Sequence, residues 1–333
     1  MAKHQPVKPI EIDGKKKLKD ILEEMETISF QGRMLGSAFR VWREMLAENV
    51  YVFFGLAGAM VPAGMRKTVA YLIENRCVDC IVSTGANLFH DLHEILGRKH
   101  YISDPNADDC EMRKKGLDRI YDTCAPEAEF EETDRYIMDF AERFDPEQPV
   151  TTARFFELLG EQAESDKKDD GIITAAYRHG VPIFCPAIAD SSYGIALAVL
   201  AEERGHGMTF DMVGDVVETA RLAEAHRTGV VFVGGGTPKN FVQQTEVTVA
   251  LLNGDARGHE YAVQISSDAP HWGGLSGCTF QEAQSWGKIS TKAKMVNLYC
   301  DATIALPLLA SALAQCGINR GKPKKASKAK ARR

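Results

Sequence analysis

Short apolar runs alternate with amphipathic segments over most of this 333-residue chain. The runs, each bounded by Gly, Pro or polar residues, lie at 51–58, 77–84, 181–188, 207–213, 229–236, 261–266 and 295–300. Runs of this length that are rich in β-branched and aromatic residues predict strands buried on both faces, as in a parallel sheet. The segments between them predict helices that cross from one parallel strand to the next. The alternation therefore predicts an α/β fold with a doubly wound, mostly parallel sheet and helices on both faces.

The N-terminal part of the chain shows a different pattern. Residues 1–48 carry apolar side chains at helical spacing, interrupted by Gly32 and Gly36, and predict a helical N-terminal extension. The α/β domain is expected to cover residues 49–317. Within it, residues 101–150 are rich in Asp, Glu and Pro and are predicted to leave the main sheet.

Composition and charge limit the partners of the chain. With 44% hydrophobic and 26% charged residues, the composition is typical of a water-soluble globular protein. No apolar run reaches the ~18 residues of a membrane helix, and the polar N-terminus has no apolar signal core, so we expect a cytoplasmic protein. The net charge is −6 although residues 320–333 hold eight basic and no acidic side chains. The body of the chain is therefore acidic, which suits a cationic substrate and argues against a nucleic-acid partner.

Residues 318–333 are predicted to form a disordered basic tail. A Lys/Ala/Pro segment of this kind buries too little apolar surface to order itself. Two functions are open for it, a solubilising tail, which we favour, or a contact with nucleic acid.

No metal site is predicted. Of eight cysteines only Cys77 and Cys80 form a CxxC pair, and without a second pair buried free thiols are favoured over zinc ligands. His90 and His93 lie one helical turn apart and could bind a metal with a neighbouring carboxylate. Their spacing is not that of an HExxH motif, so solvated or capping histidines are the favoured interpretation.

Four predicted strand-to-helix turns are unusually small or polar, at 55–66, 83–91, 186–194 and 234–240. Ligands of open α/β sheets bind beyond the carboxyl ends of the strands, where such turns lie. The last turn places three glycines at a helix start, which suits a phosphate. None of the turns matches GxGxxG, but together they favour a nucleotide-like ligand. In the loop 268–277, His271 and Trp272 could line a pocket or merely cover one.

The stretch "EAQSWGKI" places a single lysine, Lys288, at the close of an apolar segment. Gly287 directly precedes it and Trp286 stands two positions before it. Such surroundings could remove water from the ammonium group, and loss of water disfavours the charged form of a lysine.

Five segments of the chain resemble deoxyhypusine synthase in order and spacing. They are "VSTGANLFHDL", "PAIADSSYG", "VGGGTPKN", "EAQSWGKI" and "LYCDATIALPLL", and the resemblance runs from about residue 20 to 315. It implies a Rossmann-like domain and a homo-oligomer, a tetramer built from dimers, with active sites shared across an interface. Members of this family use NAD to oxidise spermidine and carry its aminobutyl group as an imine on the motif lysine. The acceptor is a lysine of a protein in deoxyhypusine synthase and the diamine putrescine in the related homospermidine synthases.

The resemblance assigns roles residue by residue. It makes Lys288 the catalytic residue, Trp286 a wall for the aliphatic polyamine and Glu282 an anchor for one of its cationic ends. Asn240 and His271 are expected in the same substrate pocket. The cofactor positions carry over to Thr84, Gly85, Ala86, Asp190, Gly235, Gly236, Ser267, Asp268, Asp301 and Ala302. To attack an imine carbon Lys288 must be neutral, whereas a free lysine titrates near ~10.4, so we expect burial beside Trp286 to lower its pKa.

The departures from the family pattern concentrate in the substrate pocket. Phe89 and His90 replace paired glutamates, one of which holds the adenosine ribose of NAD in the family. Ile195 and Leu275 replace aspartates that grip spermidine, at a cost of roughly 2–5 kcal/mol per buried charge pair. Asn240 stands where a histidine handles a proton, and an amide cannot act as a base near neutral pH.

Two functions therefore compete. The first is an NAD-dependent alkylamine transferase with an altered amine substrate. The second is a binding or assembly protein that keeps the fold and a nucleotide but has lost the chemistry. Because Lys288, Glu282 and Trp286 are retained, the first is favoured.

Overall fold

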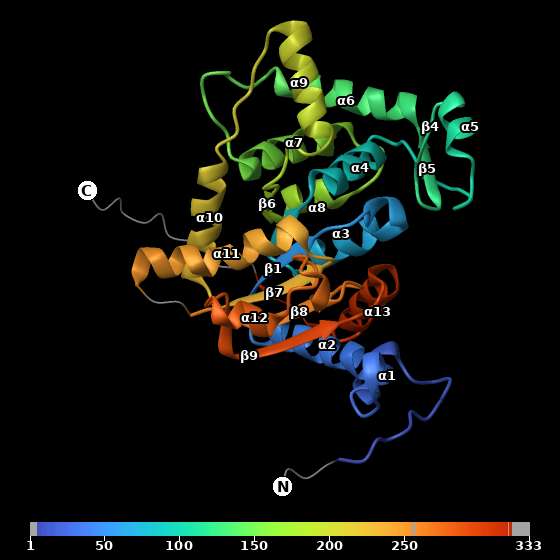
Figure 1. The fold of residues 1–333 in the computed structure, drawn as a ribbon, viewed down its shortest axis with the longest axis vertical. Helices are drawn as coiled ribbons and strands as arrows, with labels where there is room; N and C mark the ends of the chain where they lie inside the picture. Colours follow the sequence, from blue (N-terminus) through green and yellow to red (C-terminus); the bar gives the residue numbers. More distant parts are fainter. Residues whose placement is uncertain (1–4, 255–256, 319, 322–333) are drawn as a thin grey trace. The chain divides into compact units, whose positions relative to one another are not determined.

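The computed structural model describes residues 5–254, 257–318 and 320–321. It is an α/β structure, 52% helical, with a six-stranded parallel sheet in the order β6-β2-β1-β7-β8-β9 among the described residues (Figure 1). The strands are β1 (Tyr51–Leu56), β2 (Cys80–Ser83), β6 (Ile183–Phe184), β7 (Thr228–Val233), β8 (His259–Ile265) and β9 (Ile289–Leu298). The predicted α/β class with a parallel sheet is confirmed.

One predicted strand is wrong. In the run 207–213, only Phe210 makes a bridge, to Val150, and the helix α10 (Met212–Ala225) begins inside the run. The carboxylate of Asp211 accepts the backbone N–H of Gly214 at 2.7 Å. An aspartate just before a helix satisfies an N–H that has no partner in the first turn, so Asp211 favours a helix start over a strand.

The chain folds into two compact units. Unit 1 comprises residues 1–55, 75–79 and 218–333, and unit 2 comprises residues 56–74 and 80–217. Besides β7, β8 and β9, unit 1 holds α1 (Leu18–Met25), α2 (Phe30–Ala47), α11 (Gly236–Asn253), η2 (Pro270–Trp272), α12 (Phe280–Ser285) and α13 (Ala302–Ala314).

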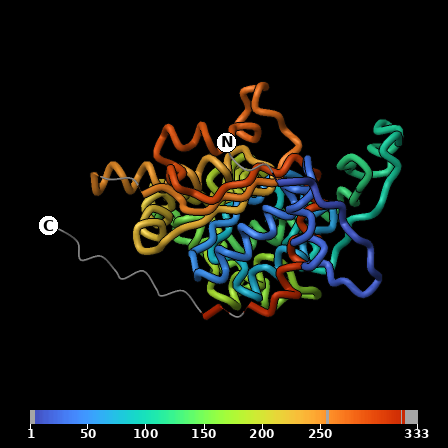
Figure 2. The backbone as a smooth tube through the Cα atoms, turned by 90° about the horizontal axis from the view of Figure 1, so that it is seen from below, coloured from blue at the N-terminus to red at the C-terminus, as the bar shows by residue number. Residues whose placement is uncertain are grey.

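The N-terminal helices belong to the core of unit 1. α2 buries a stripe that includes Phe39, Trp42 and Met45, and it contacts β8 and β9. Figure 2 shows these blue N-terminal helices beside red C-terminal segments that are distant in sequence. α2 continues through Gly36 without a break. A Cβ at this position would come within 2.6 Å of the Leu22 carbonyl oxygen in α1. The glycine lets α1 and α2 pack closely.

Unit 2 contains β2 and β6 and a second, smaller sheet. Residues 101–126 form a three-stranded antiparallel sheet in the order β3-β5-β4, so the stretch predicted to leave the main sheet does so. The remaining elements of unit 2 are η1 (Val61–Met65), α3 (Arg66–Glu74), α4 (Gly85–Ile95), β3 (Tyr101–Ile102), α5 (Asp109–Lys114), β4 (Leu117–Ile120), β5 (Thr123–Pro126), α6 (Glu127–Ala141), α7 (Thr152–Asp166), α8 (Ile172–His179) and α9 (Ser192–Arg204). No helix among the described residues combines the length and the apolarity needed to cross a bilayer.

Arg320 lies inside the stretch predicted to be a disordered tail, but it is buried in unit 1. Its guanidinium donates to the Asp79 carboxylate at 2.9 Å and to the carbonyl oxygens of Arg76 and Val50 at 2.6 Å each. The folded body therefore extends at least to this residue. The rest of the predicted tail, residues 322–333, lies outside the described residues.

Replacing Arg320 with methionine is expected to lower the free energy of unfolding by about 3–5 kcal/mol, because the Asp79 carboxylate would stay buried without the guanidinium that donates to it. Chemical denaturation measures this change. In the control Arg135→Met, loss of the exposed Arg135–Glu131 pair, 3.3 Å apart, should have little effect, less than about 1 kcal/mol. Equal losses in the two variants would contradict the anchoring role of Arg320.

Candidate active site

Lys288 is held in a tight connection between α12 and β9. Its backbone N–H donates to the carbonyl of Ala283 at 3.1 Å, and its carbonyl accepts the N–H of His259 at 3.1 Å. Gly287, with φ +71°, makes the reversal between the helix and the strand. A left-handed conformation of this kind favours glycine. The "WGK" sequence therefore fixes the backbone position of Lys288.

The start of α12 is fixed by Thr279 and Glu282. The Glu282 carboxylate accepts the Thr279 backbone N–H at 2.9 Å, and Thr279 Oγ1 accepts the Glu282 N–H at 3.2 Å. This reciprocal pair is a capping box. The bond from the Thr279 N–H lowers the pKa of the Glu282 carboxyl. Glu282 is thus an exposed, ionised carboxylate six positions before Lys288 in the sequence. An anchor for a cationic substrate needs such a charge.

Lys288 and Trp286 lie together, but at the surface. The Lys288 Nζ is 5.3 Å from the centroid of the Trp286 ring, and the Trp286 side chain is 70% exposed. Lys288 itself is half-buried, and the expected removal of water from its amine stays a prediction. Gly287 turns the chain after α12, and the Trp286 indole faces outward. A cation over an indole ring is itself favourable, so this arrangement holds the amine beside the ring.

Six predicted cofactor residues meet at one edge of unit 1. Gly235 and Gly236 follow β7, Ser267 and Asp268 follow β8, and Asp301 and Ala302 follow β9. The three strands are parallel and in register at their carboxyl ends, where Val233 pairs with Ile265 and Ile265 with Leu298. Their carboxyl ends therefore form a common edge, the usual ligand position in such sheets.

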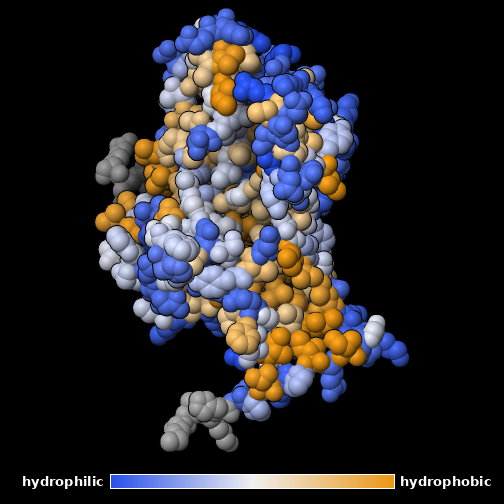
Figure 3. Space-filling model, turned by 45° about the vertical axis from the view of Figure 1, so that its right-hand side comes forward, coloured by the Kyte–Doolittle hydropathy of each residue, from blue (hydrophilic) through white to orange (hydrophobic). Residues whose placement is uncertain are grey.

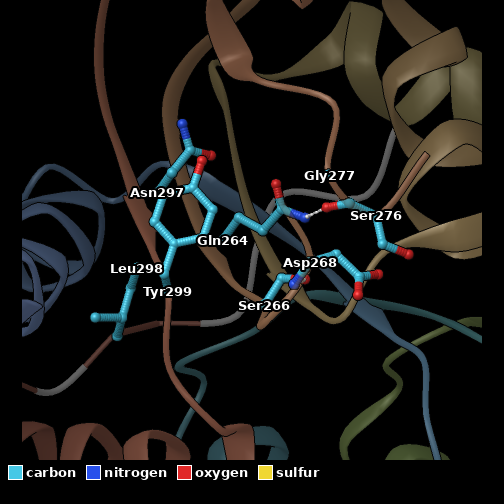
Figure 4. Close-up of a pocket in the computed structure, with 8 residues that line it drawn as sticks. All are labelled: Gln264, Ser266, Asp268, Ser276, Gly277, Asn297, Leu298 and Tyr299. Atoms are coloured by element: carbon cyan, nitrogen blue, oxygen red, sulfur yellow. Dashed lines mark hydrogen bonds between the residues drawn. The ribbon is translucent and has the colours of Figure 1, made fainter. Parts of the chain in front are cut away.

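A small pocket opens at this edge (Figure 4). It is lined mainly by hydroxyl, amide and carboxylate side chains, from Gln264, Ser266, Asp268, Ser276, Gly277, Asn297, Leu298 and Tyr299. Only Asp268 was predicted as a site residue. Gln264 and Asn297 had a signal in the sequence, because each is a polar residue inside a short apolar run, 261–266 and 295–300. A buried polar side chain in a strand needs a partner and often marks a site.

The other four predicted cofactor residues lie in unit 2. Thr84 is the N-cap of α4 and Gly85 and Ala86 begin the helix, and a Cβ at Gly85 would come within 2.2 Å of the Ser191 Oγ. The turn at Gly85 therefore packs directly on the turn that holds Asp190, whose side chain is exposed. Unit 2 thus brings these two predicted cofactor turns together.

The two positions where the family has glutamates differ in orientation. Phe89 is buried, with its ring centroid 5.6 Å from that of Phe130. His90 is half-buried and lies one helical turn beyond the exposed Ala86 on α4, so both share a face of the helix. Only His90 can present a polar atom on that face.

A chain of hydrogen bonds fixes the tautomer of His90. Arg66 Nε contacts Glu94 Oε2 at 2.6 Å, Glu94 Oε1 contacts His100 Nδ1 at 2.7 Å, and His100 Nε2 contacts His90 Nδ1 at 2.9 Å. Because the Glu94 carboxylate accepts, His100 donates from Nδ1; a neutral His100 then accepts at Nε2, and His90 donates from Nδ1 and keeps a lone pair on Nε2. Burial lowers the pKa of His90 to about 3, so the ring is neutral. In the described part of the chain, no group of three or more His, Cys, Asp or Glu side chains could hold a metal.

The other two predicted substrate residues, Asn240 and His271, belong to unit 1. Asn240 is half-buried near the start of α11, while His271 and Trp272 are exposed with ring centroids 4.3 Å apart. Leu275 of unit 1 is 48% exposed and Ile195 of unit 2 is 60% exposed. These apolar replacements of family aspartates therefore lie at the surface of their units. They are not part of a core.

Comparisons with known proteins agree with the resemblance. The family model for deoxyhypusine synthase matches residues 20–313. A protein of Methanosarcina acetivorans named "Probable deoxyhypusine synthase 2" is 50% identical over 313 residues, covering 93% of this chain and 90% of that protein. One of the same name from Archaeoglobus fulgidus is 51% identical over 302 residues, covering 90% and 98%.

A solved structure from Entamoeba histolytica that carries the same family name covers 96% of this chain and 100% of its own, with a TM-score of 0.64 and 20% identity. At this identity the likeness shows the fold alone. The family match and the two relatives each span nearly the whole chain, and the segments that carry the resemblance all fall within them. The chain therefore belongs to the deoxyhypusine synthase family.

Proposed function

We propose that this chain is an NAD-dependent aminobutyl, or alkylamine, transferase. It oxidises a polyamine, carries the aminoalkyl group as an imine on Lys288 and passes that group to an amine acceptor, a small diamine or a protein lysine. Family membership supports a transferase. The proposal of an imine on Lys288 rests on one observation. The Lys288 amine lies over Trp286 and forms no ion pair in the described part of the chain. The alternative, a homologue that has lost its chemistry, is not favoured.

The proposed transfer moves one aminoalkyl group from the donor to the acceptor with no net oxidation. NAD would accept a hydride from the carbon next to the secondary amine of the donor and return it at the end. Lys288, in its neutral form, attacks the resulting imine carbon, and the diamine fragment leaves as an amine. The acceptor amine then displaces Lys288 in the same way, and the hydride that bound NAD would supply would reduce the new carbon–nitrogen double bond to a secondary amine. Glu282 binds a cationic end of the donor, and Trp286 contacts its methylene chain.

The residues of unit 1 fit a dinucleotide. Gly236 begins α11 with φ +56°, and a Cβ there would meet nothing within 4 Å, so the helix N-terminus is open to a ligand. Open backbone N–H groups at a helix start bind phosphate. In unit 2, Thr84, Gly85 and Ala86 form a second helix start, where Gly85 is packed against Ser191 and Ala86 is exposed. There the Nε2 of His90 can accept a ribose hydroxyl in place of the missing carboxylate.

We further propose a homo-oligomer, a tetramer in which sites are shared between copies. Lys288 precedes the first residue of β9, whereas Asp301 and Ala302 follow the last. The facing ladder of β8 runs from His259 to Ile265, six steps that span roughly 20 Å. The backbone of Lys288 and that of Asp301 and Ala302 therefore lie at opposite ends of β9. A second copy could bring its Lys288 to this edge, and the apolar face that α13 gives unit 1 offers a surface for it (Figure 3).

A product screen tests the function. Purified protein is supplied with NAD and with spermidine, putrescine and agmatine in pairs, and products are identified by mass spectrometry. A new secondary amine that requires NAD and both amines supports the transferase. NAD binding without product from any pair would favour a binding protein.

His90→Phe is expected to weaken NAD binding about 10-fold, because phenylalanine keeps the volume but removes the Nε2 acceptor. Calorimetry measures the dissociation constant. His90→Gln, which retains an acceptor, should bind NAD within about 3-fold of the unchanged protein. An NAD analogue without adenosine ribose hydroxyls should bind the unchanged protein and His90→Phe equally. If His90→Phe weakened binding of that analogue about 10-fold as well, the assignment would be contradicted.

A further inference from the structure

A second lysine, Lys239, is buried in unit 1 outside the groups that the proposed chemistry uses. It lies in the first turn of α11 and is 1% exposed. In the described part of the chain it forms no ion pair. Its Nζ donates to Gln264 Oε1 at 2.8 Å and to the carbonyl of Cys278 at 2.5 Å. Burial lowers the pKa of Lys239 to about 8, and because a neutral amine still has two N–H donors, both bonds survive loss of the proton.

Gln264 completes the arrangement from β8. It is 3% exposed, and its Nε2 donates to the carbonyls of Gly234 at 2.9 Å and Ser276 at 2.6 Å (Figure 4). The Lys239–Gln264 pair therefore bonds three backbone carbonyls, one at the end of β7 and two in the loop that precedes α12. Leaving buried carbonyls without donors is costly, so the pair holds this loop firmly.

The loop has no space to shift toward the glycine turn that follows β7. A Cβ at Gly235 would lie 2.4 Å from the Ser276 Cα, and a Cβ at Gly277 would lie 2.3 Å from the Ala269 carbonyl oxygen. Contacts this close exist only because both residues lack a side chain. The Lys239–Gln264 pair pulls the loop onto the turn, and the glycines allow the contact.

The same loop leads to Lys288 through short local bonds. Cys278 is followed by the Thr279–Glu282 capping box, and the Lys288 N–H bonds to Ala283 inside α12. The buried Phe280 anchors α12, with its ring centroid 5.7 Å from the Lys239 Nζ. A displacement of the loop would therefore move the helix and the lysine that follows it.

We propose that the Lys239–Gln264 pair is a positioning device for Lys288. By bonding the loop 276–278 it sets where α12 and the reactive lysine that follows it stand within unit 1. The proposal rests on the proposed role of Lys288. A misplacement of about 1 Å can lower a rate about 100-fold, so the pair should affect turnover far more than ligand binding.

The test compares Lys239→Met and Gln264→Leu, which keep volume and remove the hydrogen bonds. Each is expected to lower kcat by about 30–100-fold while the KM values for NAD and the amine donor stay within about 3-fold. Because both side chains act on one loop, the double variant should lose no more than the worse single variant. Lys115→Met, at an exposed lysine of unit 2, is the matched control and should keep full activity.

Two further measurements keep the proposal decidable. Gln264→Glu retains the acceptor for Lys239 and loses the donors to Ser276 and Gly234, so it should fold with Lys239 paired and still lose turnover. Hydrogen exchange on each variant should rise in residues 274–290 and stay unchanged elsewhere in unit 1. If the unchanged protein formed no product, the proposed function would fail. Hydrogen exchange in residues 274–290 would still test whether the Lys239–Gln264 pair holds the loop. Variants with kcat within 3-fold of the unchanged protein, or with unaltered exchange in that segment, would overturn the proposal.

Discussion

Lys288→Arg is expected to abolish covalent capture of the substrate. When the protein is incubated with NAD and a polyamine donor and then reduced with borohydride, intact-mass measurement should show an added aminoalkyl group. The arginine variant should show none, because a guanidinium stays protonated at every accessible pH and cannot form an imine. Turnover should fall by at least about 1,000-fold, the scale expected when a covalent nucleophile is lost.

Two controls make this result specific to Lys288. Lys288→Ala removes the amine without adding a charge and should give the same loss. Lys292→Arg, at an exposed lysine four positions along β9, should be captured like the unchanged protein. Capture that persists in Lys288→Ala would assign the imine to another amine and would end the proposed mechanism.

Mixing two inactive variants is expected to restore activity. Lys288→Ala lacks the nucleophile. Gly236→Val should block the glycine turn, because a β-branched residue is strained at φ +56° and its side chain would fill the open helix start. If sites combine Lys288 of one copy with the glycine turn of another, a mixed dimer has one intact site and one doubly altered site. A sample that contains only mixed dimers therefore has half of its sites intact, which predicts about half of normal activity.

The mixture is prepared by co-expression with two different tags and purified through both. Each parent alone should remain inactive at the same concentration. Activity in the mixture no higher than in the parents would mean that each site lies within one copy, and the shared-site proposal would be abandoned. Recovery would also show that Gly236→Val preserves folding and assembly.

Most of the sheet could be predicted from the sequence because its strands are short, apolar and bounded by turn residues. The period of the pattern and the turn residues are local properties. The strand predicted at 207–213 is wrong because Asp211 accepts a hydrogen bond at the start of a helix. The pattern of apolar residues does not reveal that bond. Gly36 shows the reverse case, a residue that looked like a helix break and proved to be a helix contact. Its role depends on α1, which lies elsewhere in the sequence.

The sequence by itself determined the family, the sheet edge where Gly236, Asp268 and Asp301 gather, and Lys288 as the candidate nucleophile, because motifs at carboxyl ends of parallel strands meet wherever the strands pair. Only the tertiary structure decided the surroundings of those residues. It showed Trp286 exposed, fixed the tautomer of His90 through His100, and buried Lys239 against Gln264. Exposure, proton position and buried hydrogen bonds depend on atoms that distant segments bring together, and no local pattern carries that information.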